Sequence, residues 1–421
     1  MFSFHYFTYI CFRILGFPLS LLPYWAIHLL GKEIGRLAYY VHRPFRKKAM
    51  TNLSIAKTLY LSEKQKKKVT KESFQTLAIT CLEFFRLKRS QNKMDRLVQW
   101  GTPRHEVLDL VEKGQGVVFI NGHQANWEVA FSLMTQRYPG TAIGKPIKNK
   151  WLYRWILSIR EMHKGKIVAP KQALTKGYEV LKRGEFFGIV SDQALPESPY
   201  CYPLFGTRAW TTTAPALLAY RTGSPLVTVM TRRVGSHYHI WGSPLLWPDL
   251  SKTAKEEVPR LMDAAMGYLE ESIKACPGQW LWQHDRWKQS GINHIQRKYR
   301  YSFILIIFPQ DCKSYFGLLS VFRQLYPRSF ISLYLPQRAA DETLPDWIEP
   351  HYYATEKECF KRDWRYQIVF DFMNNKKLRR HFLKLGAFQA LAFSHGDLES
   401  ILKKTVCKPE CLTKDFTRTL A

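Results

Sequence analysis

The stretch GVVFINGHQANWEVA, residues 116–130, decides the fold expected for this chain. Its first half is an apolar run that predicts a buried strand, and its second half has a helical pattern. Between the two, a turn at Gly122 is followed by His123 and, five positions later, by Glu128. The pair is therefore expected just past the carboxyl end of a strand, where open α/β sheets bind ligands.

Short apolar runs alternate with helical patterns on either side of this stretch, as they do in an α/β core. Strands are expected at 116–121, 141–146, 186–191 and 225–233, and helices at 127–138, 151–164, 215–223 and 256–276. Ser62 and Gln65 form a capping box that opens a helix, and 77–88 is expected to be a further helix. The fold class predicted is α/β, with a central mostly parallel or mixed sheet flanked by helices.

The pattern restarts near Tyr299. Strands are expected at 301–309, 329–336 and 366–372, and helices at 313–327 and 374–386. These elements predict a smaller, Rossmann-like α/β appendage over residues 299–421. It follows a main domain over 41–298 and an amino-terminal segment over 1–40.

That amino-terminal segment predicts a membrane anchor. Residues 14–31 carry no charge, and at about 1.5 Å per residue they reach roughly 27 Å, slightly short of a bilayer core. Pro18 and Pro23 would bend a helix, so a re-entrant anchor is an alternative to a spanning one. Basic residues follow from Lys32 to Lys48 and indicate the cytoplasmic side. The remaining alternative is an amphipathic first helix of a soluble domain.

Composition points to an anionic partner. The chain has 421 residues, of which 46% are hydrophobic, and this content excludes a mainly disordered protein. Lys and Arg outnumber Asp and Glu by 63 to 34, and the formal net charge is +29. Nucleic acid, an anionic membrane and an acidic carrier protein all fit that charge. Cys407 and Cys411 are not a CxxC pair, so neither a zinc site nor a disulfide framework is expected.

The spacing of His123 and Glu128 is weak as a motif by itself, because it also occurs at His28 and at His351. His28 lies in the expected anchor, and His351 follows no expected strand. Only His123 combines the spacing with a strand and a small-residue turn. The strand and turn that precede His123 therefore make it the candidate functional histidine of the three.

A neutral imidazole can take a proton from a hydroxyl as that oxygen attacks a carbonyl, and a carboxylate on the other ring nitrogen fixes the tautomer. Such a base contributes about two to four powers of ten in rate. No Ser or Cys nucleophile is evident near His123, so activation of the acceptor substrate itself is the favoured interpretation. The ordinary alternative is a structural histidine at the start of a helix.

Several motifs, in order, resemble those of the late acyltransferases of lipid A biosynthesis, a group within the lysophospholipid acyltransferase-like superfamily. They are MTNLSIA (50–56), NGHQANWE (121–128), KPIKN (145–149), LSIREMHKG (157–165), SDQ (191–193), PLFGTRAWTTTAPALLAYRTGSPLV (203–227) and QWLWQHDRWK (279–288). The resemblance covers about residues 1 to 290. One departure is Lys145, which stands where the family usually has Arg.

This resemblance implies transfer of a fatty acyl chain from acyl carrier protein to a lipid A precursor. The acceptor would be the hydroxyl of a 3-hydroxyacyl chain on a phosphorylated glucosamine disaccharide. The partners implied are acyl carrier protein, that phosphorylated precursor and the anionic inner membrane, with the catalytic domain on its cytoplasmic face and no nucleic acid bound. No cofactor and no metal are expected.

The resemblance also assigns residues. His123 is the expected general base, Glu128 its orienting partner, and Arg160 and Asp192 complete the catalytic set by holding the thioester or stabilising the oxyanion. The ordinary alternatives are a surface helix charge for Arg160 and a strand-end cap for Asp192. Substrate contacts are expected at Asn126, Trp127, Lys145, Asn149, Gln193 and Arg286.

Other functions remain open at this point. One is acylation of a glycerophospholipid or another glycolipid, although such relatives usually carry Asp where this chain has Glu128. A nucleic-acid-binding protein and a non-catalytic membrane scaffold are the others, and no recognised nucleic-acid module is present. The segment after Tyr299 faintly resembles the first half of heptosyltransferase-like glycosyltransferases, and docking or a fusion remnant is its expected role.

Overall fold

The computed structural model describes residues 4–90, 95–102, 104–289, 295–393 and 398–407. The chain forms two compact units, each built from separate segments. The first unit comprises Met1–His42, Ser62–Gln193 and Thr211–Trp282, and the second comprises Arg43–Leu61, Ala194–Trp210 and Gln283–Ala421. These units divide the chain differently from the predicted domains, because parts of 41–298 belong to each.

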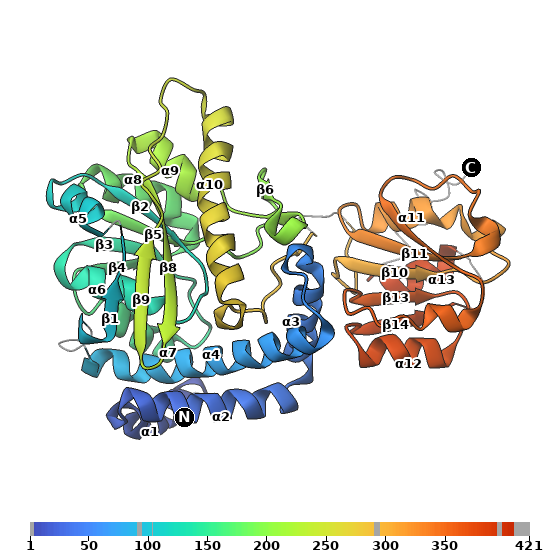
Figure 1. The fold of residues 1–421 in the computed structure, drawn as a ribbon, viewed down its shortest axis with the longest axis horizontal. Helices are drawn as coiled ribbons and strands as arrows, with labels where there is room; N and C mark the ends of the chain where they lie inside the picture. The colour runs from blue at the N-terminus through green and yellow to red at the C-terminus, as the bar shows by residue number, and fades with distance from the viewer. Residues whose placement is uncertain (1–3, 91–94, 103, 290–294, 394–397, 408–421) are drawn as a thin grey trace. The chain divides into compact units, whose positions relative to one another are not determined.

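A seven-stranded sheet forms the centre of the first unit (Figure 1). Its strands are β1 (Val98–Trp100), β2 (Val117–Asn121), β3 (Gly140–Ile143), β4 (Gly165–Val168), β5 (Phe186–Val190), β8 (Leu226–Val234) and β9 (His237–Gly242), in the order β1-β9-β8-β2-β5-β3-β4. All neighbours are parallel except β8 and β9, which pair antiparallel. The predicted central, mostly parallel sheet is confirmed.

Helices cover both faces of this sheet (Figure 1). On one face lie α8 (Ala173–Lys182), α9 (Ala214–Thr222) and α10 (Ala254–Ala275), and on the other lie α5 (Arg104–Glu112) and α6 (Glu128–Arg137). Because side chains alternate along a strand, neighbouring residues of β5 serve different layers. Phe187 approaches α8 at Gly177, whereas the ring of Phe186 meets that of Phe131 on α6.

The amino-terminal segment forms two helices, α1 (Phe4–Leu21) and α2 (Tyr24–Val41), which pack against α4 (Glu63–Ser90). Pro23 precedes α2 with extended backbone, so the expected bend at this proline is confirmed. Within the described residues, no helix combines the length and the apolarity needed to cross a membrane. The membrane anchor therefore stays a prediction.

The capping box at the start of α4 is confirmed. The backbone N–H of Ser62 donates to Gln65 Oε1 at 2.8 Å, and that of Gln65 donates to Ser62 Oγ at 3.3 Å. The helix expected at 77–88 is the second half of this same helix, which runs without interruption from Glu63 to Ser90. A helix, α7 (Lys150–Arg160), also occupies most of the range expected at 151–164.

The carboxyl-terminal part of the second unit is a five-stranded parallel sheet in the order β12-β11-β10-β13-β14. The strands are β10 (Phe303–Ile307), β11 (Phe330–Pro336), β12 (Ile348–Tyr353), β13 (Ile368–Asp371) and β14 (Gln389–Ala392). Apolar side chains of α11 (Leu318–Leu325) and α13 (Leu398–Thr405) pack on one face and those of α12 (Lys376–Lys384) on the other. The predicted α/β character is confirmed, and the likeness to half of a heptosyltransferase stays a prediction.

This sheet is not a free appendage of the second unit, because earlier parts of the chain pack on it. The unit also contains α3 (Arg43–Ile55) and the hairpin of β6 (Cys201–Tyr202) with β7 (Ala209–Trp210). Lys47 Nζ donates to the carbonyls of Leu383 and Ala387 at 2.5 and 2.7 Å, and Thr51 Oγ1 donates to that of Trp364 at 2.8 Å. The segment after Tyr299 therefore completes the environment of α3.

Gly31 and Gly35 allow α2 to approach α4 closely. A Cβ on Gly35 would lie 2.4 Å from Gln75 Cα, and one on Gly31 would lie 2.9 Å from Ile79 Cα. These contacts are with backbone, so a side chain at either position must push the two helices apart.

We expect Gly35→Val to lower the free energy of unfolding by about 1–3 kcal/mol, because overpacking forces a backbone shift. Thermal unfolding followed by circular dichroism measures the effect. Glu33→Ala is the matched control on α2, since the Glu33 side chain is half exposed and pairs with exposed Arg36. Equal midpoints for the two variants would contradict a close α2–α4 contact.

Candidate active site

His123 and Asp192 meet at one edge of the first sheet. His123 follows β2 after a turn at Gly122, and Asp192 follows β5. Since β2 and β5 are adjacent and parallel, their carboxyl ends lie side by side. A Cβ on Gly122 would lie 3.0 Å from Asp192 Oδ2 and from Leu269, so glycine gives the carboxylate its space.

The fully buried carboxylate of Asp192 accepts three hydrogen bonds of 2.7 Å. Oδ2 accepts from the backbone N–H of His123 and from the indole Nε1 of Trp280, and Oδ1 lies against His123 Nδ1. A carboxylate accepts but does not donate when ionised, so Nδ1 carries the proton. His123 Nε2 is then the basic nitrogen of the neutral ring.

The other ring nitrogen of His123, Nε2, lies near exposed Gln193. The imidazole side chain retains 12% exposure, and its Nε2 lies 3.5 Å from the amide Nε2 of Gln193. The indole of Trp127 meets the imidazole edge to face, with ring centroids 4.6 Å apart. These two neighbours restrict the plane of the imidazole ring.

The expectation that Glu128 orients His123 is wrong in this structure. Glu128 Oε2 accepts from Arg160 Nε at 3.0 Å, and Oε1 pairs with Arg160 Nη2. Glu128 is the first residue of α6, and its side chain faces the layer between that helix and the sheet. Asp192 takes the orienting position because the pairing of β2 with β5 brings it to the imidazole.

Opposing effects set the pKa of His123. Burial alone lowers it, but the charge and hydrogen bond of Asp192 and the charge of Glu128 raise it, and the resulting pKa lies above the ordinary value of 6.5. For Arg160, burial likewise lowers the pKa, and Glu128 reverses the shift and raises it. The guanidinium of Arg160 therefore stays charged, and the imidazole of His123 binds a proton more strongly than a free imidazole does.

An apolar cavity of about 140 Å³ lies between the sheet and helices α5 and α6, and it is lined by Trp127, Glu128 and Arg160 but not by His123. Its walls are mostly apolar, and its polar residues include Asn121, Glu128 and Arg160. The remaining lining includes Trp100, Val107, Leu108, Phe119, Trp127, Phe131, Met134, Ile143, Ile167, Phe186, Gly188, Val190, Val227, Val229, Ile240 and Trp241. A cavity of this composition suits an aliphatic chain with a polar group at one end.

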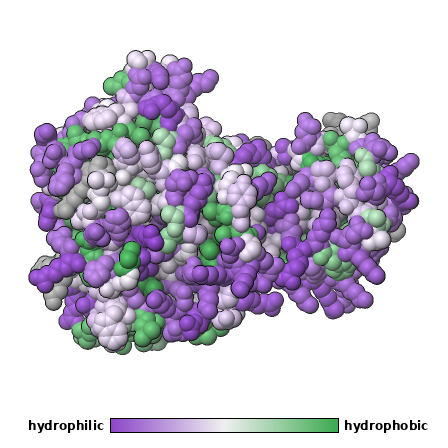
Figure 2. All heavy atoms as spheres, in the orientation of Figure 1, coloured by the Kyte–Doolittle hydropathy of each residue, from purple (hydrophilic) through white to green (hydrophobic). Residues whose placement is uncertain are grey.

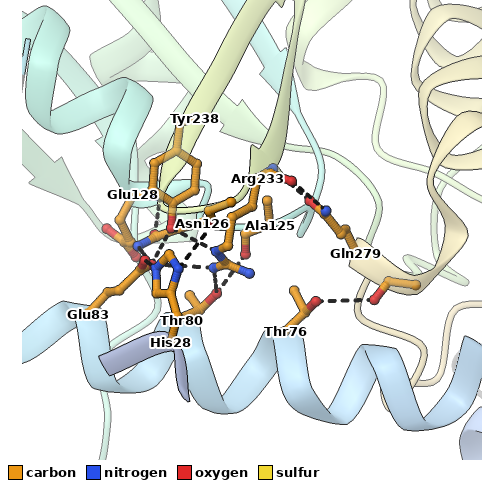
Figure 3. Close-up of polar contacts among 12 residues, drawn as sticks. His28, Thr76, Thr80, Glu83, Ala125, Asn126, Glu128, Arg233, Tyr238 and Gln279 are labelled. Atoms are coloured by element: carbon orange, nitrogen blue, oxygen red, sulfur yellow. Dashed lines mark hydrogen bonds and ion pairs between the residues drawn. The ribbon is translucent and has the colours of Figure 1, made fainter. Parts of the chain in front are cut away.

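A buried network supports the turn that carries His123 (Figure 3). Glu83 of α4 accepts from Asn126 Nδ2 at 2.8 Å, contacts His28 Nε2 at 2.5 Å and Arg233 Nη2 at 3.3 Å, and accepts from the hydroxyl of Tyr238. Burial raises the pKa of Glu83, but the charge of Arg233 and the hydrogen bond of His28 outweigh burial and hold it below its usual range. Glu83 is therefore an ionised anchor for the turn.

Asn126 belongs to this network and not to the substrate surface, which corrects the expectation for it. Its side chain is 1% exposed, its amide donates to Glu83, and its Oδ1 accepts the backbone N–H of Glu128 at 3.2 Å. The amide thus joins α4 to the start of α6. His28, whose spacing pairs it with Glu33 in the sequence, also contacts Glu83 instead.

The structure places the other expected substrate residues in different surroundings. Trp127 and Gln193 lie beside His123, and Lys145 is exposed. Asn149 is the N-cap of α7: its Oδ1 accepts from the backbone N–H groups of Trp151 and Leu152, both at 3.1 Å. That bonding is a structural role.

Arg286 stays a predicted substrate contact. It belongs to the second unit, is fully buried, and donates from Nη1 to the carbonyl of Trp210 at 3.0 Å. His351, the third histidine of the repeated spacing, lies in β12 and contacts Glu349 at 3.7 Å. The sequence patterns predicted no strand before His351, and the structure places the residue within one.

Two site residues were not singled out by the sequence patterns. Trp280 donates to Asp192, and its signal is the tryptophan-rich QWLW of residues 279–282. Glu83 lies in the expected helix 77–88, where one carboxylate among apolar residues is the only trace. Over the part of the chain that the structure describes, no group of three or more His, Cys, Asp or Glu residues is arranged to hold a metal ion.

The sequence of this chain is similar to those of known proteins. Residues 3–289 match the family described as bacterial lipid A biosynthesis acyltransferase. The chain is similar to the lipid A biosynthesis lauroyltransferase of Escherichia coli strain K12, with 23% identity over 273 residues, 63% of this chain and 87% of the relative. The lipid A biosynthesis palmitoleoyltransferase of the same strain and the lipid A biosynthesis acyltransferase of Shigella flexneri are each 26% identical over 288 residues, 63% of this chain and 86% of each relative.

We expect Asp192→Asn to lower the pKa of His123, because the amide removes the main charge that favours the imidazolium while burial and Arg160 still oppose it. NMR titration of histidine labelled with ¹³C at Cε1 measures the midpoint, and His123→Gln identifies the signal. The wild-type midpoint should lie above 6.5, and Glu128→Gln should lower it less than Asp192→Asn. An unchanged midpoint in Asp192→Asn would contradict the contact.

Proposed function

This chain belongs to the bacterial lipid A biosynthesis acyltransferases, and we propose that it moves a fatty acyl chain from acyl carrier protein to a lipid A precursor. The acceptor is the hydroxyl of a 3-hydroxyacyl chain already attached to the phosphorylated disaccharide. One observation carries the proposal above others. His123 has Nδ1 on a buried carboxylate, and Trp127, which contacts the imidazole ring, lines an apolar cavity.

His123 acts as the general base in this proposal. Nε2 takes the proton of the acceptor hydroxyl while the hydroxyl oxygen bonds to the thioester carbonyl carbon. The tetrahedral intermediate then collapses, the C–S bond breaks, and the imidazolium returns its proton to the departing thiolate. Asp192 stabilises the imidazolium between these steps through its contact with Nδ1.

Arg160 is proposed to stabilise the oxyanion that forms on the thioester carbonyl. Glu128 holds its Nε and Nη2, and the guanidinium lines the cavity. Donors fixed before the reaction stabilise a developing charge without reorganising. Glu128 is thus a positioning residue for Arg160, in place of the role expected for it beside His123.

The cavity is proposed to hold the transferred acyl chain. Each buried methylene contributes about 0.8 kcal/mol, so the depth of the cavity selects the chain length. Gly188 lies on the sheet wall, and a Cβ there would meet the Cβ of Ala142 at 3.7 Å, an ordinary contact. A larger side chain at this position can therefore enter the cavity without disturbing the strand.

Membrane contact is proposed through α1 and α2 at the cytoplasmic face of the inner membrane. Large apolar side chains of these helices are exposed, including those of Phe7, Leu15, Phe17, Trp25 and Leu37. In Figure 2, hydrophobic residues lie among polar ones at the lower left, where Figure 1 places the two helices. The charge of +29 suits an anionic leaflet, the phosphorylated acceptor and an acidic carrier protein.

We expect His123→Ala to lower the rate of acyl transfer at least about a hundredfold, because the acceptor loses its base. The assay follows the mass gain of one acyl unit on a tetra-acylated lipid A precursor supplied with acyl carrier protein thioester. His237→Ala is the control, since His237 is exposed on β9 away from the site residues. Near-wild-type turnover of His123→Ala, with an unchanged melting temperature, would remove His123 from the mechanism.

The same assay separates acceptors. A glycerophospholipid acceptor that gains the acyl unit while the lipid A precursor does not would overturn the proposed acceptor class and retain the acyltransferase.

We expect Gly188→Val to shift the preferred donor toward shorter acyl chains, by at least about tenfold in the kcat/KM ratio of two donors differing by two methylenes. The added methyl groups occupy the apolar cavity near the sheet wall. Competition between acyl carrier protein thioesters of different length measures the ratio. Ala173→Val on α8, on the opposite face of the sheet, is the control, and an unaltered ratio in Gly188→Val would place the donor chain elsewhere.

A further inference from the structure

A second crevice, of about 540 Å³, lies where α1 ends and α2 begins, against the carboxyl end of α4. Its lining residues are Ser20, Leu21, Tyr24, Arg86, Arg89, Ser90, Arg96 and Leu97. Three of the eight are arginines, and no carboxylate is among them. This composition differs sharply from that of the apolar cavity lined by Trp127, Glu128 and Arg160.

The arginines are available to bind an anion. Arg86 and Arg89 are three residues apart on α4 and share a face of the helix. The side chains of Arg89 and Arg96 are exposed, and neither forms an ion pair with a carboxylate in the described ranges. The nearby Asp95 pairs with Arg137 at 3.5 Å instead.

Arg86 carries a donor that the protein leaves unused. Its Nη1 donates to the carbonyls of Ser20 and Leu22 and so holds the end of α1. Its Nε is buried, and among the residues whose positions are described it has no hydrogen-bond partner. An unpaired buried guanidinium donor is costly, so a ligand that accepts this hydrogen bond would be favoured.

The surroundings indicate a ligand that is also a lipid. Leu21 lines the crevice and is 51% exposed, and Phe17 and Trp25 nearby are 63% and 67% exposed. An anion-binding crevice bordered by exposed apolar side chains matches a phosphate at the head of an acylated molecule. The free phosphate ion lacks the apolar part and would not use these neighbours.

Helix α4 relates the crevice to the active site. Phe84 lies under the guanidinium of Arg160, with 6.0 Å between Arg160 Cζ and the ring, and Glu83 holds Asn126. Arg86 and Ser90 follow Glu83 by three and seven residues, roughly 4.5 and 10 Å along the helix axis. A lipid with its reacting chain at His123 can therefore have its head near the crevice.

We propose that Arg86, Arg89 and Arg96 bind a phosphate group of the acylated disaccharide acceptor. This inference rests on the proposed function, because it assigns the headgroup subsite of the same reaction. The arginines supply charge-assisted hydrogen bonds to the phosphate oxygens, and the exposed apolar residues contact the lipid part. A phosphate on an ordinary membrane phospholipid has the same chemistry, so the experiment must separate the two sources.

The test uses full-length Arg89→Gln/Arg96→Gln in detergent micelles without phospholipid. Arg86 is left intact because it holds the end of α1. Equilibrium binding of the bisphosphorylated acceptor and of its two monophosphoryl derivatives is measured directly, so the result does not depend on turnover. The control Arg221→Gln/Lys255→Gln removes the same charge from exposed positions on α9 and α10.

We expect the Kd of the bisphosphorylated acceptor to rise about tenfold or more in Arg89→Gln/Arg96→Gln and to change little in the control. With the monophosphoryl derivative that lacks the phosphate bound in the crevice, the Kd of the variant should equal that of the wild type. A rise that persists with both monophosphoryl derivatives overturns the proposal. The proposal is also overturned if the Kd is unchanged in Arg89→Gln/Arg96→Gln but the variant no longer floats with vesicles containing phosphatidylglycerol. In that case the crevice binds a membrane headgroup.

Activity separates this inference from the proposed function. If the acceptor binds in an arginine-dependent way but gains no acyl unit, the crevice assignment stands and the acyl-transfer reaction fails. If acyl transfer occurs with an unchanged KM in Arg89→Gln/Arg96→Gln, the reaction stands and the phosphate subsite is wrong.

Discussion

The buried carboxylate of Asp192 is the constraint on which the active site depends. A buried charge must be paired and hydrogen-bonded, and Asp192 meets this requirement with the backbone N–H of His123, the imidazole Nδ1 and the indole of Trp280. These donors come from the end of β2 and from the segment after α10. The ionised carboxylate therefore requires three distant parts of the first unit to converge, and the orientation of the imidazole follows from that convergence.

A second buried carboxylate holds the same turn from the other side. Glu83 of α4 binds Asn126, three residues after His123, while the backbone N–H of Ala125 donates to the carbonyl of Gln279 at 2.7 Å. Ala125 has a positive φ of 46°, a conformation that a non-glycine residue adopts only when its surroundings compensate. The turn is thus fixed before any substrate arrives, which is what a preorganised base requires.

The apolar cavity follows from the alternation of side chains along the strands. One face of the sheet packs tightly under α8, α9 and α10, whereas the face under α5 and α6 retains space beside the small residue Gly188. The ion pair of Glu128 with Arg160 lines this space. The catalytic residues and the cavity proposed for the acyl chain are therefore close together, because β2, β5 and α6 contribute residues to both.

The strand, turn and helix at residues 116–137, with His123 at the end of the strand, could be predicted from the sequence, because hydrophobic periodicity and a glycine turn are local signals. The short strands β1, β4 and β9 were not predicted, since three to six residues carry little periodicity. Which carboxylate contacts the imidazole could not be predicted in this way, because it depends on how distant strands pair. Asp192 lies 69 residues from His123, and the parallel pairing of β2 with β5 joins them, while the nearer Glu128 turns to Arg160.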